Sequence, residues 1–242
     1  MRTLSISFDK KLFDEGSESQ KRQIKYGELL DSSDIIVFVK NHHSPKFLSD
    51  KVKVWPTNSS GKISYIFNAI RLSREISKQK KIDVVISQDP LFSGLTGFVV
   101  SKIIKAKHLT SVFGDNIYDS YWRRESWLRY PLYFVGVFIL QKADAIQADG
   151  LKTVDDLKKR FHGKVFWKPI IPTDIESFSR PKEPHDGINI LFVNRLIPQK
   201  NLPMLVRVIE GIYKKNFQNR PIFTVVGDGY LRDKFEKSLK KR

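Results

Sequence analysis

Hydrophobic positions along the chain alternate between short apolar runs and longer segments with helical spacing. Between residues 63 and 70, isoleucine and phenylalanine recur at intervals of three and four, as on one face of an amphipathic helix, and residues 95–103 approximate a second such helix. Strands and helices that alternate in this way predict an α/β fold built around a parallel sheet. The apolar runs that we expect to be strands are Leu4–Phe8, Ile35–Val39, Val84–Ser87, Leu109–Phe113 and Ala145–Ala148.

A break in this pattern predicts the domain organisation. Residues 172–187 contain three prolines and no apolar periodicity, which is typical of a linker. We therefore expect a first domain over residues 1–171. A second series begins at residue 188, with strands at Ile188–Val193 and Phe223–Val226 and a helix after each. Residues 188–242 are too few for a complete α/β domain, so they predict part of a second domain or, alternatively, two strands that extend the first.

The longest apolar run, Tyr130–Leu140, is too short to span a bilayer, which takes about 20 residues. It predicts a helix that is either packed on the sheet or in contact with a membrane interface, together with Trp122–Arg124 and Trp127. The first residues lack the apolar stretch of a secretory signal. We therefore expect a cytoplasmic protein, with peripheral attachment to the inner face of the plasma membrane as an open possibility.

Composition excludes several kinds of site and raises two kinds of partner. The chain contains no cysteine, which rules out disulfides, zinc–thiolate sites and a cysteine nucleophile. Its 43 Lys and Arg against 26 Asp and Glu give a net charge of +17. Such a charge suits an anionic membrane surface or a nucleic acid. Dispersed cations and the lack of a known reader motif argue against nucleic acid.

Polar residues follow several of the expected strands, at the edge where α/β sheets bind ligands. Asp89 and the segment Gly114–Asn116 occupy such positions in the first domain, and Gly16 lies in the loop after the first strand. Strand-to-helix turns alone would also account for Asp, Asn and Gly at these places, and we interpret Gly227–Gly229 as a turn of this kind.

Arg195 and Lys200 differ from these turn residues because a turn has no need of two cations. In a loop that leads into a helix they could clamp a diphosphate, although two solvated basic residues are the simpler explanation. Phosphate-binding and dinucleotide-binding glycine motifs are absent from the sequence, which removes the main support for an ATPase or a dehydrogenase.

Two segments of the second series resemble elements of family 4 glycosyltransferases. Leu191–Asn201 (LFVNRLIPQKN) is similar to the "VGRLxxxKN" element, and Val225–Arg232 (VVGDGYLR) is similar to the "VGDGPLR" element. The acceptor-domain and linker elements of the same family resemble Val112–Asn116, Ala143–Ile146 and Pro172–Phe178.

This resemblance implies a GT-B architecture, in which two Rossmann-like domains bind the acceptor and the nucleotide-sugar donor. It implies a reaction that retains the anomeric configuration and needs no metal or other cofactor. Arg195 and Lys200 match the residues that hold the donor diphosphate in the family. The first domain would be complete and the second only partly present.

The sequence also departs from the family. Many members carry a histidine where this chain has Phe113, and Asp115 is then the nearest candidate for a catalytic group that contacts the acceptor. Gly16, Asp89, Gly114 and Asn116 are the expected acceptor-side loop residues. The paired glutamates that hold the donor sugar in the family lie beyond the end of this sequence, so we expect a C-terminally truncated member whose enzymatic activity is open.

The leading hypothesis is therefore a glycosyltransferase of cell-surface polysaccharide synthesis. Its partners would be a nucleotide-sugar donor, a glycan or lipid-linked saccharide acceptor, and an anionic membrane surface. One alternative is a non-catalytic homologue that binds an acceptor or another partner at the membrane. A basic nucleic-acid-binding protein is the second alternative.

Overall fold

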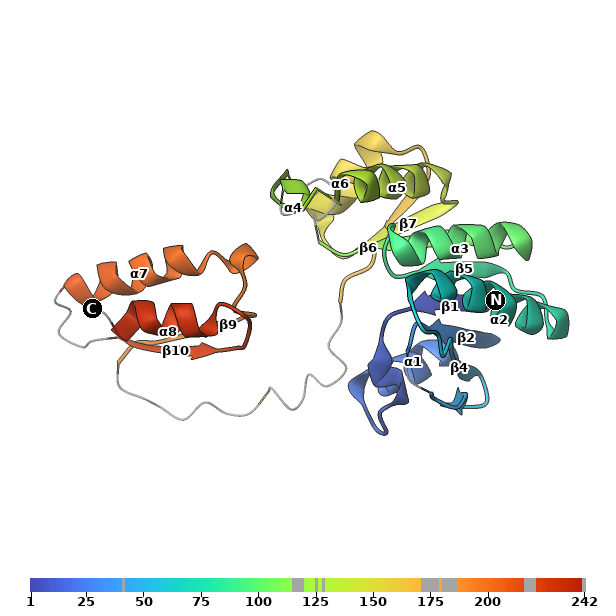
Figure 1. The fold of residues 1–242 in the computed structure, drawn as a ribbon, viewed down its shortest axis with the longest axis horizontal. Coiled ribbons are helices and arrows are strands. Elements are labelled where there is room, and N and C mark those ends of the chain that lie inside the picture. Colours follow the sequence, from blue (N-terminus) through green and yellow to red (C-terminus); the bar gives the residue numbers. More distant parts are fainter. Residues whose placement is uncertain are drawn as a thin grey trace. The chain divides into compact units, whose positions relative to one another are not determined.

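The computed structural model describes residues 1–40, 42–114, 120–124, 126–127, 129–170, 179, 187–215 and 221–240. The chain divides into two compact units, Met1–Ile175 and Glu176–Arg242 (Figure 1). This division falls within the range 172–187 that we expect to be a linker, of which only residues 179 and 187 are described. The catalytic candidate Asp115 and its neighbour Asn116 lie outside the described residues.

The first unit is built on an eight-stranded sheet with the order β3-β4-β2-β1-β5-β6-β7-β8. All neighbouring strands are parallel except β3 and β4, which pair antiparallel. The elements are β1 (Arg2–Ser7), η1 (Lys10–Phe13), α1 (Glu18–Glu28), β2 (Ser32–Val37), β3 (Lys46–Phe47), β4 (Val52–Pro56), α2 (Lys62–Gln79), β5 (Val84–Ser87), α3 (Phe92–Ile103), β6 (Lys107–Val112), α4 (Ser120–Arg124), α5 (Arg129–Lys142), β7 (Ala145–Ala148), α6 (Leu151–Arg160) and β8 (Lys164–Trp167). The expected α/β class with a parallel sheet is confirmed.

Both faces of this sheet bury apolar side chains. Successive residues of a strand point to opposite faces, and β2 places Ile36 in a core with residues of α2 and α3, whereas Ile35 and Val37 pack with Leu12 of η1. The sheet therefore has helices α2 and α3 on one face and η1 with α1 on the other. Strand β2 is buried on both sides for this reason.

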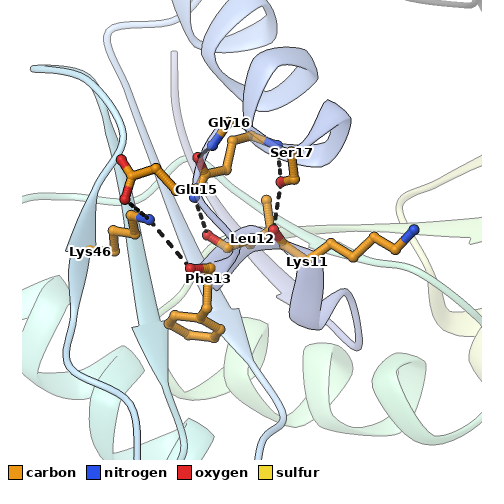
Figure 2. A network of polar contacts seen from close by, with 8 residues as sticks. Lys11, Leu12, Phe13, Glu15, Gly16, Ser17 and Lys46 are labelled. Atoms are coloured by element: carbon orange, nitrogen blue, oxygen red, sulfur yellow. Dashed lines mark hydrogen bonds and ion pairs between the residues drawn. The ribbon is translucent and has the colours of Figure 1, made fainter.

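A network of polar contacts holds the turn before α1 (Figure 2). Oγ of Ser17 accepts a hydrogen bond from the backbone N–H of Gln20 at 3.3 Å and donates to the carbonyl of Lys11 at 2.6 Å. The Gln20 side chain accepts from the backbone N–H of Gly16 and donates to the carbonyl of Leu12. Ser17 is thus the N-cap of α1, and the Gln20 side chain returns its hydrogen bond to Gly16 instead of to Ser17, the partner in a regular capping box.

The apolar run at residues 130–140 forms most of α5, and only one side of this helix is buried. Ile139 and Leu140 lie in the core, while Tyr130, Phe134 and Phe138 are exposed. One side of the helix is therefore packed in the core, as expected, and contact of the other side with a membrane interface stays a prediction. Among the described residues, no helix is long and apolar enough to cross a membrane.

The second unit contains a two-stranded parallel sheet with helices packed on it. Its elements are β9 (Asn189–Val193), η3 (Pro198–Lys200), α7 (Leu202–Lys214), β10 (Ile222–Val226) and α8 (Arg232–Lys240). Leu196, Leu202, Val206 and Phe235 form its buried core. The other face of the sheet exposes apolar residues, among them Leu191, Val193, Ile222 and Val226.

Candidate functional site

The site with the best-defined geometry lies where β9 and β10 end. The loop from Asn194 to Lys200 and the loop from Gly227 to Gly229 leave the carboxyl ends of these paired strands, which is where open α/β sheets bind ligands. The loops are joined backbone to backbone. Leu196 donates its N–H to the carbonyl of Asp228 at 2.8 Å, and Leu231 donates to the carbonyl of Leu196 at 3.2 Å.

The two glycines of the second loop make this close packing possible. A Cβ at Gly227 would overlap the carbonyl oxygen of Asn194, and one at Gly229 would lie 2.5 Å from the carbonyl oxygen of Leu196. Both glycines also have positive φ, +155° and +157°, where side chains are disfavoured. Our interpretation of this segment as a simple turn is therefore incomplete, because the segment also braces the loop that carries Arg195.

Arg195 and Lys200 lie in this braced loop and both are exposed. Neither cation forms an ion pair with a carboxylate among the described residues. Lys200 ends the short helix η3, and Asn201 follows it in the left-handed conformation at the N-cap of α7. Pro203 has no N–H and Met204 donates its N–H to the carbonyl of Asn201 at 2.9 Å, so the first turn of α7 contributes mainly the positive end of its helix dipole. Two exposed cations in the loop that leads into this helix form an arrangement suited to an anion.

In the first unit, Asp89 follows β5 and fixes the start of α3. One carboxylate oxygen accepts from the backbone N–H of Leu91 at 2.7 Å and the other accepts from the Ser93 hydroxyl at 2.7 Å. Burial raises the pKa of Asp89 above its usual value. The side chain is thus engaged in local structure, and a contact with an acceptor stays a prediction.

A buried chain of hydrogen bonds between β5 and β6 also holds the loop that contains Asp89. His108 shares a 3.1 Å contact from Nε2 with the hydroxyl of Ser87, which donates to the Thr110 hydroxyl at 3.0 Å. The Thr110 hydroxyl in turn donates to the carbonyl of Asp89 at 3.3 Å. Polar core residues of β5 and β6 therefore position the Asp89 loop.

Gly16 and Gly114, two further acceptor-side positions, lie in turns that follow η1 and β6. Gly114 follows β6 at a φ of +73° and donates its N–H to the Asp149 carboxylate after β7, at 3.2 Å. Gly16 lies in the turn after η1, where Lys46 contacts the Phe13 carbonyl and the Glu15 carboxylate (Figure 2). The structure thus places these glycines in ordered turns, and their contact with an acceptor stays a prediction.

Two residues at the carboxyl edge of this sheet, Trp167 and Lys168, are not predicted from the sequence. Trp167 donates from Nε1 to the carbonyl of Asp149 at 3.0 Å. The Nζ of Lys168 lies 4.9 Å from the ring centre of Tyr26 on α1, and burial together with the charge of Arg22 lowers the pKa of Lys168. Trp167 ends β8 and Lys168 follows it. The alternation of apolar and polar residues in this short strand is too weak to predict the strand from the sequence.

A metal site finds no support in the part of the chain that the structure describes. No group of three or more His, Asp or Glu residues there could hold an ion. The expectation of a reaction without metal stays a prediction.

No family model and no curated protein matches this sequence. Solved structures do match. Sucrose-phosphate synthase from Thermosynechococcus elongatus is similar over 100% of this chain and 67% of its own, with 13% identity and a TM-score of 0.71. A lipopolysaccharide outer core galactosyltransferase is similar over 100% and 65%, with 14% identity and a TM-score of 0.59. The UDP-GlcNAc 2-epimerase of Methanocaldococcus jannaschii is similar over 100% and 68%, with 15% identity and a TM-score of 0.56.

These similarities support the expected GT-B type of fold. The chain spans about two thirds of the length of these structures, and 65% of the galactosyltransferase. The identities are too low to carry activity from one chain to another. Moreover, a galactosyltransferase and an epimerase are both similar to this chain in fold, so the fold alone does not decide which reaction is catalysed.

Proposed function

We propose that the chain is a glycosyltransferase of family 4 type, which transfers a sugar from a nucleotide-sugar donor with retention of configuration. The acceptor would be a glycan or lipid-linked saccharide in cell-surface polysaccharide synthesis, reached at the cytoplasmic face of the membrane. Among the structures of the same fold, one from Anabaena was solved in complex with UDP and glucose. UDP is accordingly the first nucleotide to test.

The observation that carries this proposal is the braced loop at the end of β9. Arg195 and Lys200 are exposed on it and unpaired among the described residues, and the loop leads directly into α7. Two cations can neutralise a donor diphosphate. Because negative charge grows on the leaving diphosphate as the sugar bond breaks, their effect is larger in the transition state than in the bound donor.

The motifs favour transfer over epimerisation, which the shared fold leaves open. Arg195 and Lys200 occupy the positions of "GRLxxxK", and Gly227–Gly229 that of "GDG", in the resemblance to family 4 glycosyltransferases. The backbone contact between the two segments explains why both motifs would occur together, because a change in one loop displaces the other.

On the acceptor side, Asp115 is the proposed catalytic group. It directly follows Gly114, whose backbone is tied to Asp149 at the carboxyl edge of the sheet. Gly16, Asp89 and Asn116 would shape the same edge, with Asp89 acting through the loop that it fixes. The nucleotide-sugar is a co-substrate in this proposal, and no metal is required.

Calorimetric titration with UDP tests the donor site without requiring turnover. We expect Arg195→Ala and Lys200→Ala each to weaken UDP binding about tenfold or more, as expected for a lost charge-assisted contact. Lys214→Ala is the matched control, because it removes the same charge from the opposite end of α7. Equal affinity in all four proteins would overturn the assignment.

Product analysis then separates the two reactions. Transfer releases UDP from the donor in proportion to the acceptor supplied, whereas epimerisation returns an intact nucleotide sugar with altered stereochemistry. Acceptor-independent conversion of UDP-GlcNAc would contradict the proposed transfer.

A further inference from the structure

The outward face of α5 is apolar, which is unusual for a helix on the surface of a sheet. Tyr130, Phe134 and Phe138 follow one another at four-residue intervals and are 51%, 67% and 44% exposed. At 1.5 Å per residue these three positions extend over about 12 Å of helix. A helix that faces water normally carries polar residues there, and contiguous exposed apolar patches mark interaction sites.

The opposite face of α5 already packs in the core of the first unit. The exposed row of Tyr130, Phe134 and Phe138, called the stripe below, is therefore not a set of core residues turned the wrong way. Leu140 is buried in the cluster formed with β6, β7 and α6, and Tyr133 and Val137 pack against it. Ile139 is also fully buried. Rotation of α5 to hide the three exposed aromatics would expose these residues.

Cations flank the stripe. Helix α3 packs against α5 (Figure 1), and its Phe98 ring lies 5.6 Å from that of Phe138. Nζ of Lys102 lies 5.4 Å from the Phe98 ring centre, and Lys142 ends α5 one turn beyond Phe138. We call Tyr130, Phe134, Phe138, Lys102 and Lys142, with the 78% exposed Trp127, the aromatic–basic face.

The positive charge of the aromatic–basic face helps to decide which partner binds it. Asp144, two residues after Lys142, is already paired with Lys107 at 2.8 Å. Both charged residues named in this face are positive, so a second copy docked symmetrically on it would gain no ion pair between them. An anionic lipid surface supplies phosphate groups for the lysines and an interfacial layer that accepts Trp, Tyr and Phe rings.

We propose that the aromatic–basic face docks on an anionic bilayer, with the rings in the interfacial layer and the lysines at the lipid phosphates. Helix α5 runs against the direction of the parallel strands, so its first turn lies toward the edge of the sheet that carries Gly114 and Asp149. Docking would therefore bring that edge close to the membrane. The binding step itself does not depend on sugar transfer.

Vesicle flotation of the full chain tests this docking without donor or acceptor. The vesicles contain phosphatidylcholine alone or mixed with an equal amount of phosphatidylglycerol. We expect binding to the mixed vesicles and little to the neutral ones. Equal recovery from both compositions, or no binding to either, would overturn the proposal.

Matched variants locate the surface. Phe134→Gln is expected to weaken partitioning about tenfold, because its ring would lose burial in the interface. Phe47→Gln, at a ring that is 65% exposed on β3, should leave it unchanged. Removal of one cation by Lys142→Gln is expected to weaken partitioning about fivefold. The control Lys25→Gln removes a cation from the last turn of α1 and should leave vesicle binding unchanged.

Folding and self-association are checked on the same proteins. All four positions are exposed, and circular dichroism should show the native spectrum in each variant. Light scattering distinguishes the alternative occupant. A dimer that dissociates in Phe134→Gln, with vesicle binding unchanged, would contradict the lipid assignment and favour a second copy.

Discussion

Strands of similar composition are covered differently in the two units. In β2 of the first unit, Ile35, Ile36 and Val37 are all buried, because helical segments lie on both faces of the sheet. In β9 and β10 of the second unit, burial alternates, and among the described residues helices cover one face only. The apolar content of a strand therefore does not tell how many of its faces are buried.

The comparison also separates two ways of holding a functional loop. In the first unit, side chains of the buried core, such as Ser87 and Thr110, support the Asp89 loop. In the second unit the core is small, and the loop that carries Arg195 is held mainly by backbone contact with Gly227–Gly229. The predictions below test this difference.

The largest expected difference concerns two isoleucines on parallel strands. Ile36→Ala, at a fully buried position of β2, should lower the free energy of unfolding by about 2–5 kcal/mol because it leaves a cavity. Ile222→Ala, at a position of β10 that is 62% exposed, should change it by only about 0.5 kcal/mol.

Chemical denaturation can follow the units separately. All four tryptophans lie in the first unit, so tryptophan fluorescence reports on that unit, while circular dichroism reports on both. A similar loss of stability in the two variants would contradict the difference in burial.

A substitution in the second unit tests the backbone contact. Gly227→Ala should cost roughly 2–4 kcal/mol and also weaken UDP binding, because the new Cβ overlaps the Asn194 carbonyl and forces the loops apart. Gly211→Ala is the matched control. No atom lies within 4 Å of its added Cβ, and alanine in a helix is favoured by up to about 1 kcal/mol over glycine. Normal UDP affinity in Gly227→Ala would show that the contact does not shape the site.

A smaller effect concerns pH and the buried core of the first unit. Burial lowers the pKa of His108 to about 4, while Asp144 opposes and Lys102 adds to this shift. The unfolded chain therefore binds a proton that the folded chain excludes, and stability is retained above the unfolded pKa and lost as pH falls toward 4. From pH 7 to pH 5 the loss should be about 2 kcal/mol.

Denaturation of His108→Gln isolates this contribution. The variant keeps a side chain that can reach Ser87 and does not titrate, so its stability should vary less over the same pH range. The difference between the two proteins also removes the opposite contribution of Asp89, whose pKa is raised by burial. Parallel pH profiles would show that His108 is not responsible.

The sequence predicts the regular parts of the fold because their periodicity is local. Strands β5 and β7 begin and end where the apolar runs do, and α2, α3, α7 and α8 follow their apolar spacing. Strands β3, β4 and β8 were missed because they are short or charged on alternate positions. Their place is fixed by neighbouring strands, which the sequence does not reveal.

The candidate site is predictable in its residue types and not in its geometry. The spacing of Arg195 and Lys200 is visible in the sequence. The need for glycine at 227 and 229 arises from carbonyl groups more than 30 positions earlier in the chain, at Asn194 and Leu196. Lys168 gives no sequence signal at all, because its proximity to Arg22 depends on the fold.

Hydrogen exchange with and without UDP tests the central claim most directly, since it locates the bound nucleotide without any substitution. We predict slower exchange in the segments 194–201 and 227–231, with little change in the strands of the first unit. Arg195→Ala should remove this protection. Protection confined to the first unit, or none at saturating UDP, would contradict a donor site at the ends of β9 and β10.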